Sequence, residues 1–186
     1  MDTTCAWAMN HELEREYHDK EWGVPVYNDK VLFEFITLEG AQAGLSWITI
    51  LKKREGYRQA FEDYDLDILA AYEDGHAEHI VENYDVVKHR GKIKSVFSNA
   101  RAAKELIGEY GSLSQALWQF VDGKPRVNQW QEMSEVPAST EQSKAMSKFL
   151  KKKGFKFVGE TICYAFMQAV GMVDDHLVSC PKKPKY

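Results

Sequence analysis

The sequence predicts an all-α protein. Residues 91–107 place apolar side chains three and four positions apart along their whole length, which is the spacing of one stripe on a helix. Polar residues that commonly cap helices precede several further apolar segments. We find no run of alternating apolar and polar residues, the pattern of a half-buried strand. With 186 residues the chain is long enough for one hydrophobic core, and we expect a single domain over residues 1–186.

Cap residues predict where most of the helices begin. The expected starts lie at Asn28–Asp29, Ser46, Asp65, Gly75, Ser112 and Ser139. The helix after Asn28 carries Glu39 among apolar residues, and the helix after Ser46 begins with Trp47. The segment 122–138, which holds two prolines, is the one long loop that we expect.

The last third of the chain predicts a helical hairpin over about residues 140–171. Ser139 and Gln142 have the spacing of a capping box at the start of its first, lysine-rich helix. That helix ends at Gly154, and a second helix begins at Gly159 after a short turn. Free backbone N–H groups at this second start, beside lysines, are suited to hold a phosphate without reading base sequence. The simpler alternative is that Gly154 only ends a helix.

Charges are segregated along the chain, although the net charge is only −4. Nine acidic residues and no Lys or Arg lie between Glu62 and Asp85. The basic clusters are Lys52, Lys53, Arg54 and Arg58; Lys88, Arg90, Lys92 and Lys94; and Lys144, Lys148, Lys151, Lys152, Lys153 and Lys156. An acidic side and a basic side would let the protein approach a phosphate backbone in one orientation. The alternative is a set of solvated helix faces.

Composition indicates an ordinary folded protein and not a membrane or secreted one. Apolar residues make up 44% of the chain and charged residues 28%. No apolar run is long enough to span a bilayer, and charged residues within 12–16 occupy the place of a signal-peptide core. Three cysteines without a secretion signal do not indicate a disulfide scaffold. We therefore expect a cytoplasmic protein with no membrane partner.

Two cysteines and two histidines near the chain ends predict a metal site. Cys5 and His18 flank the N-terminal segment, and His176 and Cys180 lie among the last eleven residues. Two thiolates and two imidazoles form a closed tetrahedral zinc site, which leaves no position for a catalytic water. A shared zinc ion would tie the two ends of the chain together. Each residue alone is better explained as a stray thiol or a surface histidine, but the set favours a metal.

A carboxylate among aromatic residues marks a candidate binding pocket. The N-terminal third is rich in Trp, Tyr and Phe, and within it Glu39 is followed by small residues, a helix break and Trp47. Aromatic faces hold a flat cationic heterocycle by cation–π contact, and a carboxylate orients its donor edge. The alternative is that the aromatic residues are core and the glutamate lies on the surface, as is usual for both types.

Six segments follow one another in the order of a known family. They are Tyr17–Gly23, Leu38–Trp47, Lys52–Arg54, His89–Lys92, Lys153–Gly159 and the His176…Cys180 tail. Together they resemble 3-methyladenine DNA glycosylase I, from about Cys5 to Cys180. The resemblance implies a helical fold similar to the helix-hairpin-helix DNA glycosylases, with a structural zinc ion joining the N- and C-terminal segments. The ligands that it implies are Cys5, His18, His176 and Cys180.

The resemblance also implies what the site residues do. Glu39 is the expected catalytic residue and hydrogen-bonds the adenine edge, while Trp47 stacks on the base. Tyr17 and Trp22 are expected to line the pocket. The expected DNA contacts are Gly44, Leu45, Lys153, Gly154, Lys156 and Gly159. The implied partners are double-stranded alkylated DNA as substrate and free 3-methyladenine as product, for a monomer in the bacterial cytosol.

This chemistry suits the residues. Methylation of adenine at N3 makes the base a cation, so the departing base becomes neutral and needs no strong general acid. Neutral adenine would leave Glu39 buried without compensation. Two alternatives remain: a bifunctional glycosylase-lyase in which Lys153 or Lys156 forms a Schiff base, and a zinc-stabilised DNA-binding module without catalysis. Asp174 and Asp175 adjoin a predicted zinc ligand, and orienting its imidazole suits them better than catalysis.

Overall fold

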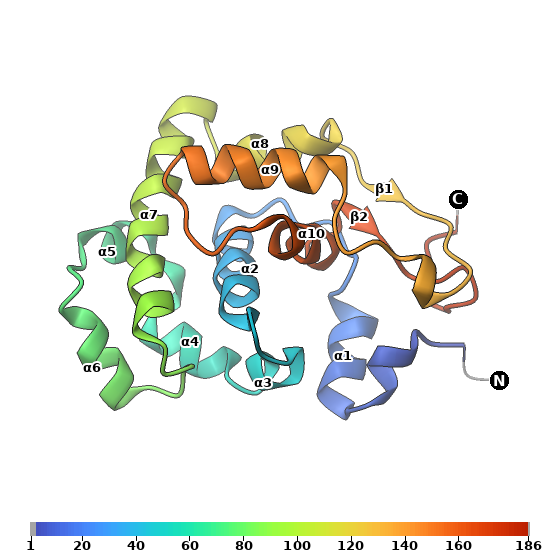
Figure 1. Cartoon of the computed structure of the whole chain (residues 1–186), viewed down its shortest axis with the longest axis horizontal. Coiled ribbons are helices and arrows are strands. Elements are labelled where there is room, and N and C mark those ends of the chain that lie inside the picture. The colour runs from blue at the N-terminus through green and yellow to red at the C-terminus, as the bar shows by residue number, and fades with distance from the viewer. Residues whose placement is uncertain (1–2, 186) are drawn as a thin grey trace.

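In the computed structural model, which describes residues 3–185, the chain is built almost entirely of helices. In chain order the elements are η1 (Ala6–Met9), α1 (Glu12–Lys20), α2 (Asp29–Gln42), α3 (Trp47–Leu51), α4 (Arg54–Ala60), η2 (Glu62–Tyr64), α5 (Leu66–Ala71), α6 (His76–Asn83), α7 (Arg90–Tyr110), α8 (Leu113–Trp118), η3 (Gln119–Val121), β1 (Arg126–Val127), η4 (Met133–Glu135), α9 (Glu141–Lys152), α10 (Glu160–Ala169) and β2 (Val173–Asp174). The prediction of an all-α protein is confirmed, apart from one short pair of strands (Figure 1).

The central helix of the fold is α2. It lies between α7 and α10 (Figure 1), and it contacts α3 and α8 as well. Ten consecutive residues, from Leu32 to Ala41, are buried. A helix that is apolar on all sides belongs in a core, so Glu39 enters the interior with its apolar neighbours. The side chain of Asn28 accepts a hydrogen bond from the Val31 N–H at 3.1 Å, which confirms the predicted start of this helix.

The helix starts predicted at Ser46, Asp65, Gly75 and Ser112 are found as well. The side chains of Asp65 and Ser112 cap α5 and α8. Asp29 caps a helix other than its own, because its carboxylate accepts hydrogen bonds from the N–H groups of Leu113 and Ser114. The start of α2 is thereby joined to the start of α8.

The capping box of α9 lies one residue later than predicted. Thr140 is the N-cap, and its side chain accepts a hydrogen bond from the Ser143 N–H at 3.2 Å. In return the Ser143 hydroxyl accepts one from the Thr140 N–H at 2.8 Å. The box predicted at Ser139 and Gln142 is wrong, because the reciprocal hydrogen bonds join Thr140 and Ser143.

Two short strands lie where the sequence predicts none. Arg126 and Val127 of β1 pair in parallel with Val173 and Asp174 of β2. Two residues are too few for an alternating pattern to stand out in a sequence. The pairing ties the otherwise irregular segment 122–138 to the chain that follows α10.

The hairpin formed by α9, its turn and α10 lies across one side of α2 (Figure 1). Gly154 ends the first helix with φ +98°, as a C-cap glycine does. The Asn99 side chain of α7 accepts a hydrogen bond from the Lys156 N–H at 2.9 Å and donates one to its carbonyl at 3.2 Å. Ser147 donates to the Val158 carbonyl at 2.6 Å, so the turn is held on both sides.

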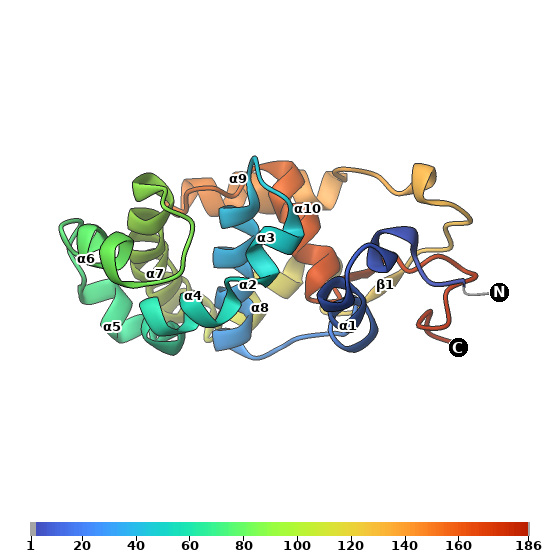
Figure 2. The same cartoon turned by 90° about the horizontal axis from the view of Figure 1, so that it is seen from below.

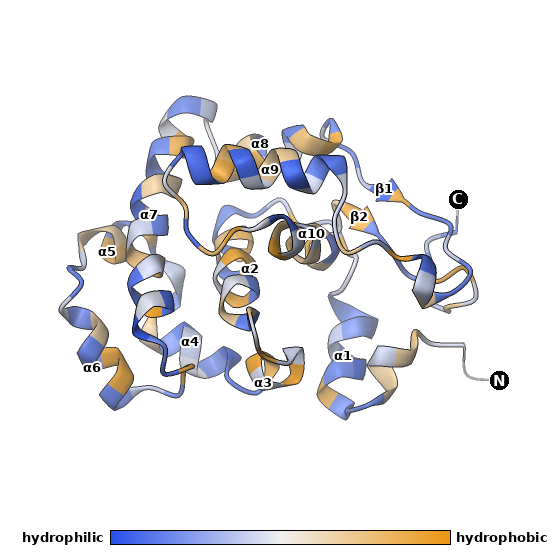
Figure 3. Ribbon diagram, in the orientation of Figure 1, coloured by the Kyte–Doolittle hydropathy of each residue, from blue (hydrophilic) through white to orange (hydrophobic). Residues whose placement is uncertain are grey.

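The two ends of the described chain lie at the same end of the molecule in both views (Figures 1 and 2). Figure 3 shows hydrophobic residues on α2 and α10 in the middle, whereas α9 carries both hydrophilic and hydrophobic segments. Among residues 3–185 no helix combines the length and the apolar character needed to cross a membrane.

Gly171 tests how tightly the end of α10 packs on the chain before α2. It has φ +73°, and a Cβ there would lie 2.4 Å from the Pro25 nitrogen and 2.5 Å from the Val24 carbonyl carbon. We expect Gly171→Ala to lower the free energy of unfolding in urea by about 2–4 kcal/mol. The control is Gly108→Ala in α7, where the space is open and a gain of roughly 0.5–1 kcal/mol is expected. Equal stability of the two variants would contradict this packing.

Candidate active site and metal centre

A cleft of about 270 Å³ opens between α1, α2 and α10. The four residues predicted to bind the base, Tyr17, Trp22, Glu39 and Trp47, all line it. The remaining lining residues are Trp7, Glu14, Gln42, Met133, Ala165 and Gln168. The structure therefore brings together all of the predicted pocket residues.

Aromatic rings form much of the wall of this cleft. Trp7 packs edge-on against Trp22 with ring centroids 5.1 Å apart, and Tyr17 lies 5.4 Å from Trp47. The Nε1–H group of Trp47 is buried and has no hydrogen-bond partner among the described residues. The wall thus offers flat apolar faces and one unused donor to a planar ligand.

The sequence interpretation did not assign the other six lining residues to the pocket, and three of them show why. Trp7 belongs to the aromatic-rich N-terminal third and lies two positions after the predicted metal ligand Cys5, and these were the signals that could have identified it. Glu14 is half-buried on α1. Met133 belongs to η4 within the long loop, and nothing in the local sequence marks it.

Glu39 is a carboxylate buried without a counter-charge. Its side chain is almost fully buried, with a residue exposure of 4%. Within residues 3–185 no hydrogen bond or ion pair to this carboxylate is found, and burial raises the pKa of Glu39 to about 8. Burial, and then the nearby Glu39, also raise the pKa of Tyr17 well above its ordinary value.

The two arginines after α3, Arg54 and Arg58, are committed to other acids. Arg54 donates two hydrogen bonds to Glu21, at 2.7 and 2.9 Å, and Arg58 donates to Glu34 at 2.9 Å. The lining of the cleft contains two glutamates and no Lys or Arg. A cationic ligand would therefore favour the ionised form of Glu39, which the protein alone disfavours.

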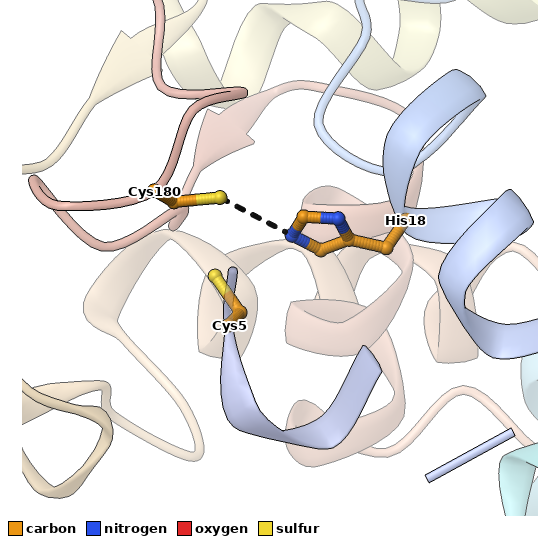
Figure 4. Close-up of side chains that lie close together, drawn as sticks. All are labelled: Cys5, His18 and Cys180. Carbon is orange, nitrogen blue, oxygen red and sulfur yellow. Dashed lines mark hydrogen bonds between the residues drawn. The ribbon is translucent and has the colours of Figure 1, made fainter. Parts of the chain in front are cut away.

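Three of the four predicted metal ligands converge at the other side of α1. The ligand atoms of Cys5, His18 and Cys180 lie within 4.8 Å of one another, and all three residues are buried (Figure 4). The Cys180 Sγ atom lies 3.6 Å from Nε2 of His18. Burial and the neighbouring Cys180 raise the pKa of Cys5 to about 11. This group could hold a metal ion, which binds the thiolate form of cysteine.

The fourth predicted ligand, His176, lies beside this group. Its ring centroid is 4.8 Å from that of His18. Its Nε2 atom is buried and has no hydrogen-bond partner among residues 3–185. The Nδ1 atom of His176 lies 3.1 Å from Asp174, and that of His18 lies 2.8 Å from Asp19. A carboxylate that holds Nδ1 in this way leaves Nε2 available for a metal, so His176 has the donor atom that a fourth ligand needs.

The group of Cys5, His18 and Cys180, called the metal group below, lies next to the cleft. Tyr17 lines the cleft, and the next residue, His18, belongs to the metal group. Trp22 lies edge-on to His176, with ring centroids 4.7 Å apart. Gly23 has φ +80°, and a Cβ there would lie 2.9 Å from the His176 ring. Glycine at this position is what allows the histidine to approach the tryptophan.

The two acids before His176 have separate roles. Asp174 holds the imidazole of His176, as the sequence interpretation proposed for one of the pair. Asp175 is fully buried. Its carboxylate accepts hydrogen bonds from the side chains of Asn128, Trp130, Tyr164 and Gln168. Neither aspartate lines the cleft, which agrees with the expectation that they are not catalytic.

The predicted DNA contacts lie on two segments. Gly44 has φ +79° with open space around it, and Leu45 is 41% exposed beside the cleft residue Gln42. On the hairpin turn the Lys156 side chain is exposed, whereas Lys153 is paired with Glu109 at 2.8 Å. The structure therefore leaves only part of the predicted hairpin charge unpaired.

The predicted separation of an acidic and a basic side is not what the structure shows. Several cations pair with acids of the segment 62–85. These pairs are Lys30–Asp63, Lys53–Asp85, Lys104–Asp67 and Arg90–Glu78. Arg90 and Lys104 meet these acids because α5 and α6 pack against α7.

The chain is similar to proteins of known activity along almost its whole length. The family described as Methyladenine glycosylase matches residues 7–183. DNA-3-methyladenine glycosylase 1 of Escherichia coli is 49% identical over 176 residues, which are 95% of this chain and 94% of that protein. DNA-3-methyladenine glycosylase of Haemophilus influenzae is 49% identical over 185 residues, which are 98% of this chain and 99% of that protein.

Solved structures agree with these relatives. A crystal structure of 3-methyladenine DNA glycosylase I has a TM-score of 0.93 and 47% identity, and the match covers 98% of this chain and 100% of that chain. A variant of 3-methyladenine DNA glycosylase I in complex with 3-methyladenine has a TM-score of 0.94 and 36% identity, with 98% of each chain covered.

The raised pKa of Glu39 predicts how stability depends on pH. Between its ordinary pKa of 4.5 and about 8, the folded protein keeps a proton that the unfolded chain releases. The wild type therefore loses stability as pH rises through this window, and Glu39→Gln does not. Between pH 5 and pH 9 we expect the variant to gain roughly 2–5 kcal/mol relative to wild type in urea unfolding. A difference that does not change with pH, or an equal gain in the exposed control Glu12→Gln, would contradict this burial.

Proposed function

The chain belongs to the methyladenine glycosylase family, and from this we propose that it hydrolyses the N-glycosidic bond of 3-methyladenine in alkylated DNA. The observation that carries the proposal is the burial of Glu39 without a cation, at the end of an aromatic cleft. The product is the free base, and an abasic site remains in the DNA. The reaction is a step of DNA repair.

Charge explains why this cleft would select the methylated base. 3-Methyladenine carries a positive charge while it is attached to the sugar, and it supplies the counter-charge that Glu39 lacks. Normal adenine is neutral, so it would not favour the ionised form of Glu39 and would gain no ion pair with it. The aromatic walls favour the cation in the same direction, because ring faces attract positive charge.

The bond cleavage itself needs little acid catalysis. When the bond between the base nitrogen and the sugar breaks, its electron pair passes to the base and neutralises the charge. The sugar becomes oxocarbenium-like and is then attacked by water. We propose that Glu39 is the catalytic residue, because a carboxylate beside the reacting centre stabilises positive charge at each stage. Tyr17, Trp22 and Trp47 are proposed to hold the base.

DNA binding is proposed to use the two segments that flank the cleft. Gly44 and Leu45 would fill the gap left by a flipped nucleotide, since Leu45 is an exposed apolar side chain at the end of α2. The hairpin, with Lys153, Gly154, Lys156 and Gly159, would hold the phosphate backbone as in helix-hairpin-helix proteins. We further propose a monomer acting in the cytoplasm, because one such cleft encloses one base and the named relatives come from bacteria.

The metal is proposed to be a structural zinc ion held by Cys5, His18, His176 and Cys180. The orphaned Nε2 of His176 and the close Cys–His–Cys group support this ligand set. Zinc bound by four protein ligands contributes folding energy and leaves no position for water. It would tie η1 to the C-terminal segment and so hold Trp7 in the wall of the cleft.

Release of free bases from methylated duplex DNA tests the activity. We expect the wild type to release 3-methyladenine and to leave 7-methylguanine in place. Glu39→Gln should lower the single-turnover rate by on the order of 100-fold or more, whereas Glu12→Gln should not change it. No release by folded wild type would favour a DNA-binding module. A covalent adduct trapped with borohydride would favour the lyase alternative.

Metal content tests the proposed ligand set. We expect one zinc ion per chain of wild type in native mass spectrometry, and none in Cys180→Ala. The matched control is Cys163→Ala, because Cys163 is buried in α10 and lies outside the metal group. Chelation should also lower the melting temperature of wild type, since the metal binds the folded state. Equal zinc content in the two cysteine variants would refute the site.

A further inference from the structure

The half-buried side chain of Lys92 reaches the C-terminal end of α2. The sequence places it in a basic cluster near Arg90, where a phosphate contact is a natural interpretation. In the structure its Nζ atom donates hydrogen bonds to the carbonyl oxygens of Ala41 at 3.0 Å and Ala43 at 2.6 Å. Two of the three N–H donors of the ammonium group are therefore used within the protein.

These carbonyls belong to the C-terminal end of α2. The last carbonyls of a helix lack partners within the helix, and they carry partial negative charge. Lys92 supplies both a donor and a positive charge from the first turns of α7. It is thus a helix cap contributed by a segment distant in sequence.

The segment held by Lys92 connects the cleft to a predicted DNA contact. Glu39 lies two residues before Ala41, while Gly44 and Leu45 directly follow Ala43. Gly44 has φ +79°, and no atom lies within 4 Å of the position that its Cβ would take. Packing around Gly44 therefore does little to hold the loop 43–46. The other hydrogen bonds of this loop, such as those from the Leu45 N–H to the Gln42 carbonyl and between the hydroxyls of Ser46 and Thr49, are local, so Lys92 is the side chain that ties it to a distant helix.

The same helix also holds the hairpin turn. Asn99, seven residues further along α7, makes two hydrogen bonds to the backbone of Lys156. Phe157 has φ +57°, lies edge-on to His89 at 6.0 Å, and its carbonyl oxygen and Cβ lie 3.3 Å from a Cβ placed on Gly40. A non-glycine residue in this conformation is held there by its surroundings. One face of α7 thus contacts both segments proposed to touch DNA.

We propose that Lys92 is a positioning residue, which sets the loop 43–46 relative to the hairpin so that DNA is held and the target nucleotide is kept out of the duplex. The proposal rests on the proposed function for its reaction, but the DNA-binding part can be tested without it. Lys92 acts through the backbone of the loop and does not touch the base.

The test compares Lys92→Met with Lys92→Arg. Methionine keeps much of the side-chain volume and removes the donors, whereas arginine keeps donors that can reach two carbonyls. The control is Lys104→Met, which lies on α7, away from the cleft, and is paired with Asp67. Three quantities are measured: the affinity for free 3-methyladenine by tryptophan fluorescence, the affinity for duplex DNA with a stable abasic-site analogue, and the single-turnover excision rate.

We expect Lys92→Met to bind the free base as wild type does, and to lose on the order of 100-fold in excision rate and in affinity for abasic DNA. Lys92→Arg should recover part of both losses, and Lys104→Met should lose neither. The slope of DNA affinity against salt concentration should not change, because a lost phosphate contact would reduce it by about one.

Three results would overturn the proposal. They are unchanged excision and DNA binding in Lys92→Met, a smaller salt slope, and an equal loss of free-base binding, which would indicate a collapsed cleft. Failure of the proposed function can be told apart from failure of the Lys92 proposal, because in the first case folded wild type would release no base. In that case abasic-DNA affinity alone decides whether Lys92 positions the loop.

Discussion

The uncompensated burial of Glu39 is the constraint on which the site depends. The apolar helix α2 carries this carboxylate into the interior, and no cation of the described chain reaches it. Arg54 is close enough to lower the pKa of Tyr17, yet it is held by Glu21. In the free protein the ionised form of Glu39 is therefore destabilised by burial, and a cationic base would offset this cost. Binding and discrimination follow from the same electrostatic term, which is why one residue can serve both.

The wall around that carboxylate is assembled from parts distant in sequence. Trp7 comes from η1, which begins directly after Cys5, and Trp22 packs against His176 near the other end of the chain. The side chains of Cys5, His18 and Cys180 meet between these two ends of the chain, and this group could hold a metal ion. A structural metal in this position would act on substrate binding indirectly, through the shape of the cleft.

The two segments that we propose to contact DNA are both held by α7. Its first turns hold the loop after α2 through Lys92, and its middle holds the hairpin turn through Asn99. Many basic residues outside the hairpin are paired with acids, including Arg90 with Glu78. Net charge and charge runs are therefore a poor guide to this interface, since ion pairing is decided by which helices meet.

The sequence by itself determined the helices and the types of chemistry. Helix spacing and caps are local, so the starts of α2 and α7 could be predicted, and so could the grouping of Glu39 with aromatic residues. Tertiary structure alone decided what depends on long-range approach: the strand pair, the presence of Met133 in the cleft and the contact of Lys92 with the end of α2. Each of these is set by a partner many residues away, and such a partner leaves no periodic signal in the local sequence.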